Sequence, residues 1–431
     1  MPSNQAGVAR KTGTPRRVAF DSIGRTVFTM TVVSSSATSR VLATLHSALA
    51  AWREGDPAPL EEWSARELDE AGAPVESPLR EWAQALEALA ETARGRSGGR
   101  ETDGKVLDFV RMLLRFSRPD GATATASDAP GRPREFWRKV RTAFPADDVD
   151  RALDWWFPRR GVADAATPPP PASWSASDRV LGVLRADWTK RGDVLAFDQR
   201  TGADALLELF GRGVSWLGPR WSTSGEEIEA PARVTALESG PNAGAAEWTF
   251  RAGGREITRL AVTLHGRRLA LLADLHAEGD VVAALDVPAG LSYQPLAAPG
   301  AATLKPDKSG KSAQAVLIAP GEARFDAASR RLQLRSTAGG RWLPLLVSWD
   351  HARHRRPLTW VELTVAEDGR RCPRDVAWAA RASWGRSETF VFYRSLGRSA
   401  RRSFLGCSTT ARLLVGRFTP EGDVEPIVTL E

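Results

Sequence analysis

The proline-rich segment TPPPPAS, residues 167–173, separates two different patterns of apolar residues along this chain. Before it, apolar residues recur three or four positions apart, as in SRVLATLHSALAAWREGD (39–56) and SPLREWAQALEALAETARG (77–95), which predicts amphipathic helices. After about Asp178, short apolar runs alternate with Gly, Pro, Asp and Arg turns every ~8–12 residues, which is typical of a large antiparallel sheet. Four successive prolines fit neither pattern, so the chain changes architecture at this segment.

These patterns predict an α+β multidomain protein, in which an N-terminal helical domain is followed by a large antiparallel β-sandwich. The length of 431 residues is sufficient for about two or three domains, each with its own core. Further helices are expected at 103–121, 133–144 and 147–158. We predict a flexible basic N-terminus over 1–37, a helical domain over 38–165, a proline-rich linker over 166–177 and the β-sandwich over 178–431.

Basic residues outnumber acidic ones, and much of the excess lies near the C-terminus. The chain carries 59 Lys and Arg against 52 Asp and Glu, and residues 350–418 alone hold fourteen Arg and six Asp or Glu. Guanidinium groups bind anionic groups through paired hydrogen bonds, so this segment is predicted to bind an anionic polysaccharide. The candidate ligand-binding residues are Arg353, Arg355, Arg356, Arg394, Arg401 and Arg402. The chain has only seven lysines and no recognisable nucleic-acid motif, which argues against DNA or RNA as the partner.

The common catalytic motifs are absent. The sequence contains no P-loop, GxGxxG, HExxH, CxxC or GxSxG motif, so no cofactor is expected. Five histidines remain: His46, His265, His276, His351 and His354. We expect His46 to be a partly buried packing residue of a helix and His265 to lie in a hairpin turn. No Cys or carboxylate follows the HARHRR segment (351–356) at ligand spacing, so this segment is interpreted as a solvated basic loop and not as a metal site.

Cellular location and assembly are only loosely bounded by the sequence. Cys372 and Cys407 allow at most one disulfide, and the sequence leaves open whether they pair. The N-terminal MPSNQAGVARKTGTPRRVAF is cationic but has no apolar core of signal-peptide length. There is no run of about eighteen apolar residues, so no membrane span is predicted. The cytoplasm is the default location, a periplasmic or extracellular one stays open if the start is misassigned, and the oligomeric state is not indicated.

Four segments follow one another in an order that is characteristic of one enzyme family. LLRFSRPDGATATASD (113–128) joins the helical part to the sheets, and VLRADWTKRGDVLAFDQR (183–200) places an apolar strand after an Arg and a Trp. TGADALLELFGRGVSWLGP (201–219) and REITRLAVTLHGRRLALLADLH (255–276) follow, the latter reaching Asp274 through a hairpin. Together these segments resemble the heparinase II/III-like polysaccharide lyases. The resemblance implies a β-sandwich preceded by a helical toroid, of which the helical domain here would be a remnant, and cleavage of uronic-acid polysaccharides by β-elimination.

The segment around residues 200–218 departs from the family pattern at the metal-binding positions. The family loop H-x-H-x-D-A-L aligns on Asp204, which places its two histidines at Arg200 and Gly202. The aspartate of the following Asp-x-Gly falls on Gly218. Glycine has no ligating side chain, and a guanidinium repels a cation. Of the family's metal-binding positions, this sequence therefore retains only Asp204. We predict that the family metal is missing.

The residues that the family uses for elimination are also largely missing. Elimination needs a base for the C5 proton, an acid for the leaving oxygen and a group that neutralises the carboxylate. The family supplies Tyr, His and Asn or Arg, many of them on the toroid, whereas residues 1–165 contain no Tyr, only His46, and only Asn4. We therefore predict a catalytically degenerate relative that binds an anionic polysaccharide or has a structural role. Two alternatives stay open: an active lyase that uses His276, Tyr293 and His351, or a basic nucleic-acid or protein interaction module.

Overall fold

Helices form the N-terminal part of the protein, as the spacing of its apolar residues requires. The computed structural model describes residues 35–74, 79–94, 104–124, 132–158, 168–176, 180–200, 204–223, 228–297, 300–307, 314–319, 321–336, 340–350, 353, 356–385 and 388–431. Its helices are α1 (Ser35–Glu54), α2 (Ala58–Glu67), α3 (Leu79–Arg94), α4 (Gly104–Arg115), α5 (Pro133–Ala143) and α6 (Asp147–Trp156). In α4, Val106, Phe109 and Leu113 lie on one buried stripe. This stripe is the apolar face that the sequence pattern predicts.

Two expectations about the helices need correction. The α2 helix was not predicted; Pro57 precedes its first residue and Pro59 lies in its first turn, which tolerates proline because the missing N–H would have no helical partner. His46 is exposed, and not partly buried as expected. It follows Leu45, which faces the core, and one position along a helix turns a side chain about 100° around the axis. The predicted flexible N-terminus lies outside the described residues up to residue 34, and α1 already begins at Ser35.

The strands form four antiparallel sheets. The first contains β1 (Trp174–Ser175), β2 (Leu181–Arg185), β3 (Val194–Asp198), β4 (Ala205–Gly211), β5 (Val214–Leu217), β6 (Arg220–Thr223), β11 (Val282–Asp286), β15 (Glu322–Asp326) and β16 (Arg331–Arg335). The second contains β7 (Ile228–Ser239), β8 (Ala243–Ala252), β9 (Arg255–Leu264), β10 (Leu269–His276), β12 (Leu291–Pro295), β13 (Ala301–Pro306), β14 (Ala315–Ile318) and β17 (Trp342–Ser348). The third contains β18 (Leu358–Glu362), β21 (Ala377–Trp384), β22 (Glu388–Ser395), β25 (Leu413–Phe418) and β26 (Val424–Leu430). The fourth contains β19 (Ala366–Glu367), β20 (Arg370–Arg371), β23 (Arg402–Phe404) and β24 (Cys407–Thr409).

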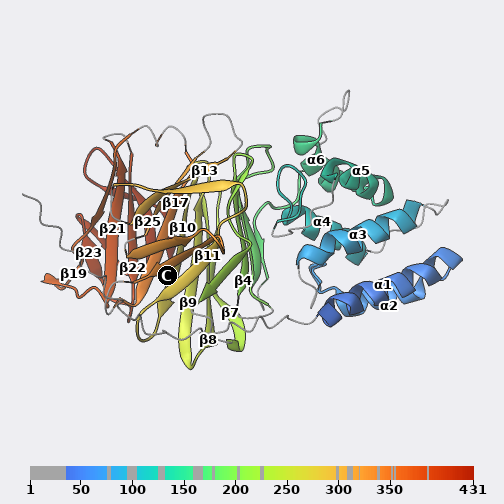
Figure 1. Ribbon diagram of the computed structural model, residues 1–431, viewed down its shortest axis with the longest axis horizontal. Coiled ribbons are helices and arrows are strands. Elements are labelled where there is room, and N and C mark those ends of the chain that lie inside the picture. Colours follow the sequence, from blue (N-terminus) through green and yellow to red (C-terminus); the bar gives the residue numbers. More distant parts are fainter. Residues whose placement is uncertain are drawn as a thin grey trace, which may run out of the picture.

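The sheets are stacked, and a hydrophobic core fills each space between neighbouring layers. The helices pack against the first sheet, where Phe109 shares a core with Val183. Trp248 belongs to the core between the first and second sheets, Phe392 to the core between the second and third, and Phe404 to the core between the third and fourth. In Figure 1 the helices lie on one side of this stack, and the fourth sheet, with β19 and β23, lies on the other. The predicted antiparallel, β-rich architecture is confirmed, and it consists of four stacked sheets.

The described part of the proline-rich segment packs against its neighbours. The carbonyl of Pro170 accepts a hydrogen bond of 2.8 Å from the indole Nε1 of Trp188, and the carbonyl of Pro171 accepts one of 3.2 Å from Arg115 Nε. Trp174, a few residues further, already belongs to β1 and contacts Phe116 edge to face. The prolines therefore line the boundary between helices and sheets.

The two cysteines are free. The strand registers place Cys372 opposite Val365, Val365 opposite Phe404, and Phe404 opposite Cys407. The thiols are thus three strand spacings apart, about 14 Å, which is far too long for a disulfide. Among the described residues, none of the helices is long and apolar enough to cross a membrane.

Candidate functional site

A groove with basic lining lies between the second and third sheets. Its volume is about 700 Å³, and we call it the basic groove. Strands β12, β13 and β14 with the residues next to them form one wall, and β18, β21 and the residues before β18 form the other. The lining residues are Gln294, Pro295, Leu296, Thr303, Lys305, Gln314, Val316, Arg353, Arg356, Leu358 and Trp384.

The chemistry of the basic groove suits a ligand that carries negative charge and hydroxyl groups. Lys305 and Arg356 are exposed and contribute two positive charges, and none of the described lining residues is acidic. Gln294 and Gln314 add amide groups that both donate and accept hydrogen bonds, and Lys305 Nζ donates to Gln294 Oε1 at 3.2 Å. Leu296 is 40% exposed at the rim and offers an apolar contact for a ring face. Cations, amides and a small apolar surface are the groups that recognise an acidic sugar.

Arg353, one of the predicted ligand-binding residues, supports the wall of the basic groove. Its Nε and Nη2 donate to the two carboxylate oxygens of Glu388 at 2.7 and 3.1 Å. Its guanidinium lies over the rings of Trp384 and Phe390, at 5.2 and 5.1 Å from their centroids. The side chain is only 3% exposed. Its charge is therefore compensated inside the protein, and Arg353 holds β22 against the groove.

The other predicted arginines are not brought to one surface. Arg394 is buried and forms an ion pair of 2.5 Å with Glu247. Arg402 is buried and donates to Glu367 at 3.0 Å and to Ser395 at 2.7 Å. Arg401 is exposed and donates to Ser408 at 3.0 Å, and Arg356 is the exposed member that lines the basic groove. Arg355 lies outside the described residues, as does the catalytic candidate His351.

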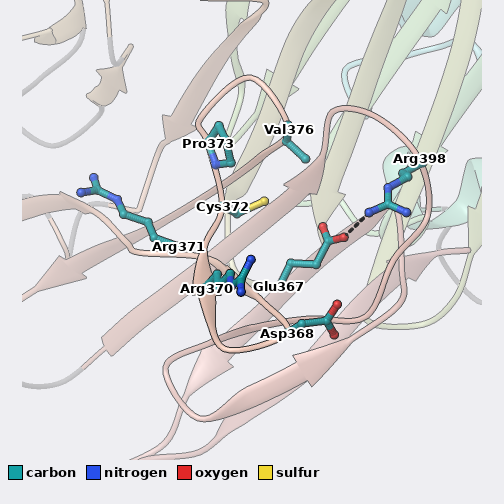
Figure 2. Close-up of a pocket in the computed structure, with 8 residues that line it drawn as sticks. All are labelled: Glu367, Asp368, Arg370, Arg371, Cys372, Pro373, Val376 and Arg398. Atoms are coloured by element: carbon teal, nitrogen blue, oxygen red, sulfur yellow. Dashed lines mark hydrogen bonds and ion pairs between the residues drawn. The ribbon is translucent and has the colours of Figure 1, made fainter.

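A second cavity, of about 570 Å³, lies between the third and fourth sheets. Figure 2 shows its lining residues, Glu367, Asp368, Arg370, Arg371, Cys372, Pro373, Val376 and Arg398. The carboxylate of Glu367 points into the cavity and forms an ion pair of 2.6 Å with Arg398. Two carboxylates thus offset much of the charge of the three arginines, and this cavity is a poorer site for a polyanion than the basic groove.

The two described catalytic candidates lie far apart. His276 ends β10 and is 2% exposed, with its backbone N–H donating to the carbonyl of Arg341 at 2.9 Å. Tyr293 lies on β12, where its ring stacks on Phe325 at 4.8 Å, and burial raises the pKa of its hydroxyl. Strands β12 and β10 are separated by β13, β14 and β17, which is four strand spacings or on the order of 19 Å. The structure does not bring these two side chains together as one acid–base pair.

The residues at the 200–218 segment do not fit a metal ion. Arg200 donates to both carboxylate oxygens of Asp198, at 3.0 and 2.8 Å. Gly218 has φ +127°, and a Cβ there would lie 2.2 Å from the carbonyl oxygen of Leu207, so no ligating side chain can replace it without moving the strand. Asp204 is half-buried and lies near Arg220; the hydrogen bond to Asp286 raises the pKa of that guanidinium, and the charge of Asp204 acts in the same direction. Within the described ranges, there is no group of three or more His, Cys, Asp or Glu side chains that could hold a metal.

Two titratable groups with large pKa shifts lie near the start of β3 and in the β9–β10 turn. Burial raises the pKa of Asp193 from 3.8 to about 7, against the opposing effects of a hydrogen bond from Trp349 and the nearby charge of Arg268. Burial lowers the pKa of His265 from 6.5 to about 4, and neither ring nitrogen has a hydrogen-bond partner among the described residues. His265 lies in a hairpin turn as predicted. Both side chains are buried, so their pKa shifts affect the stability of the fold and its dependence on pH.

Most of the groove-lining residues are not among those predicted from the sequence. β13 spans Ala301–Pro306 and presents Lys305 at the groove. The alternation in LSYQP and AATLKP is the signal for this hairpin, and its polar residues Gln294, Thr303 and Lys305 line the groove.

Comparisons with known proteins identify the fold. The sequence matches no family model and no curated protein. The structure resembles the heparan sulfate lyase HepC of Pedobacter heparinus, with a TM-score of 0.58, 11% identity, and coverage of 85% of this chain and 67% of the lyase. A heparinase III gene product gives a TM-score of 0.60 at 10% identity with coverage of 83% and 65%, and heparinase III gives 0.59 at 11% with coverage of 83% and 67%. This chain therefore has a polysaccharide-lyase-like fold and spans about two thirds of the length of those lyases.

Proposed function

We propose that this protein binds an anionic polysaccharide in the basic groove and does not cleave it. The observation that carries the proposal is a groove of about 700 Å³ whose described lining consists of cationic, amide, hydroxyl and apolar side chains without a carboxylate. A polyanion gains charge-assisted hydrogen bonds from such a lining without meeting a repulsive charge. The fold shared with heparan sulfate lyases is consistent with a carbohydrate ligand.

The proposed absence of cleavage is supported by where the two described candidate acid–base groups lie. His276 is buried at the end of β10, and Tyr293 lies on β12 on the order of 19 Å away across the sheet. General acid–base catalysis requires its groups within hydrogen-bond reach of one substrate. Neither His276 nor Tyr293 lines the basic groove. A saccharide held there would meet no proton acceptor of this pair.

The proposal predicts a selective loss of binding when the exposed cations of the basic groove are removed. Changing Lys305→Ala together with Arg356→Ala should weaken heparin binding at least about tenfold, because each hydrogen bond to a charged group contributes about 1.5–3 kcal/mol. The wild-type protein should elute from heparin resin at a higher salt concentration than this variant, since exposed charges are screened by salt.

The matched control is Arg370→Ala with Arg371→Ala, which removes the same charge from the second cavity. This control should shift the elution much less than the groove variant. Equal shifts for the two variants would show that only net charge matters, and an unchanged elution of the groove variant would remove the basic groove from the proposal.

A further inference from the structure

Three arginines cross the boundary between the helices and the first sheet. Arg185 of β2 and Arg200, just after β3, reach from the sheet toward the helices. Arg118, which follows α4, reaches in the opposite direction and donates to Glu208 of β4 at 3.0 Å. All three guanidinium groups also lie over aromatic rings at the boundary. The helix–sheet boundary is therefore held by directed polar contacts as well as by its apolar core.

Arg200 is the most fully engaged of the three. Its Nε and Nη2 bind the carboxylate of Asp198 at 3.0 and 2.8 Å, which fixes the guanidinium on the sheet. The remaining terminal nitrogen, Nη1, donates to the carbonyl of Pro74, between α2 and α3. The guanidinium lies 5.5 Å from the ring centroid of Trp82 on α3, and the side chain is only 5% exposed. One side chain thus joins a sheet carboxylate to two contacts in the helical part.

Arg185 makes a second connection nearby. It is 1% exposed, and its Nη2 donates to the carbonyl of Arg115 at 3.0 Å and to the carbonyl of Ser117. Its guanidinium lies between Trp188 at 4.8 Å and Trp156 at 5.4 Å. Burial lowers its pKa to about 9, so it stays charged at neutral pH. Two carbonyl groups on the helical side, the ring of Trp156 on α6 and the ring of Trp188 after β2 compensate this charge.

We propose that the Arg200 guanidinium substitutes for the metal ion at the 200–218 segment and fixes the helical part to the first sheet. We call its contacts with Asp198, Pro74 and Trp82 the latch. The family resemblance of the sequence implies a cation at this segment, whereas Arg200 itself brings a fixed positive charge to the position of one metal ligand. That charge neutralises Asp198, and its remaining donor reaches across the boundary to Pro74. Helices and first sheet then behave as one rigid unit without a metal. This inference is independent of saccharide binding in the basic groove.

The test is hydrogen exchange of the folded full-length protein carrying Arg200→Ala. Amide exchange around Pro74 and Trp82 should accelerate about tenfold or more, because the buried charge-assisted contact across the boundary is lost and Asp198 is left without its counter-charge. Strands β8 to β10 should exchange at the wild-type rate. Arg200→Lys keeps the charge but not the paired geometry, and should give a smaller acceleration at the same sites. The lysine variant also keeps the test usable if the alanine variant does not fold.

The matched control is Arg220→Ala. Arg220 lies near the same segment and donates to Asp286 at 2.8 Å, but it is 47% exposed and its partner is within the first sheet. This control should leave exchange in the helices unchanged. Unchanged helical exchange in both Arg200 variants would overturn the latch, as would equal acceleration in the control. One tightly bound zinc per chain, measured in wild-type protein after incubation with zinc, would overturn the replacement of the metal.

Discussion

Changing Asp274→Ala should destabilise the stacked sheets by about 3–5 kcal/mol, because it leaves a guanidinium buried without its counter-charge. Arg259 and Asp274 form an ion pair of 2.9 Å between the first two sheets, and both side chains are completely buried. Arg259 also donates to Gln199 and lies 4.4 Å from the ring centroid of Trp221. Urea unfolding followed by tryptophan fluorescence measures the loss, since Trp221 contacts the affected group.

Two further variants test whether the loss of stability comes from the unpaired buried charge of Arg259 or from any substitution in the sheets. Replacing both partners, Arg259→Met with Asp274→Leu, should cost much less than Asp274→Ala alone, because no buried charge remains. Glu229→Ala should change the free energy of unfolding by less than about 1 kcal/mol, because its pair with Arg251 is exposed and 3.9 Å long. A loss below about 1 kcal/mol for Asp274→Ala would contradict the importance of the buried pair.

Changing Asp193→Asn should stabilise the protein increasingly as the pH rises from about 4 to 8. The pKa of Asp193 is raised by burial from 3.8 to about 7, so the folded state retains a proton that the unfolded state has lost. The contribution of the protonated Asp193 to the free energy of unfolding is fully present below pH 4 and is lost as the pH rises through 7. The shift corresponds to about 4 kcal/mol. An asparagine has no charge to bury and keeps an acceptor for the indole N–H of Trp349, which lies 2.9 Å from Asp193 Oδ1.

His265 acts in the opposite direction and hides part of this effect in the wild-type protein. Its pKa is lowered by burial from 6.5 to about 4, so stability rises with pH across that window. Between pH 4 and 6.5, the fall in unfolding free energy caused by Asp193 nearly cancels the rise caused by His265. In the Asp193→Asn variant only the rise caused by His265 remains. Unfolding free energies of both proteins at a series of pH values measure the difference. A difference that is constant with pH would show that Asp193 is not buried as a carboxylic acid.

The fold was predictable as far as local patterns determine it. Apolar spacing located most helices, whereas α2 was not predicted; its first turn contains Pro59, at a position that tolerates proline. The strands were recognised as apolar runs, yet their stacking was not, because β2 and β3 are buried on both faces and show no alternation. A continuous apolar strand does not indicate how many layers surround it.

The site was less predictable, because charge can be counted from the sequence and ion-pair partners cannot. Arg394 pairs with Glu247, which lies in another sheet, and Arg353 pairs with Glu388 on β22. Both arginines contribute to the local charge excess but carry no free charge at the surface. Lys305 and Gln294 lie outside the basic segment 350–418 and reach the basic groove only through the pairing of β12 with β13.

Calorimetric titration of the wild-type protein with heparan sulfate is the most direct test of polysaccharide binding without cleavage. The same samples are then examined for the ultraviolet absorbance of an unsaturated uronate, the product of β-elimination. We expect saturable, salt-sensitive binding and no increase in absorbance over prolonged incubation. A sustained rise in absorbance would contradict the absence of cleavage, and a lack of binding at low salt would contradict the function of the basic groove.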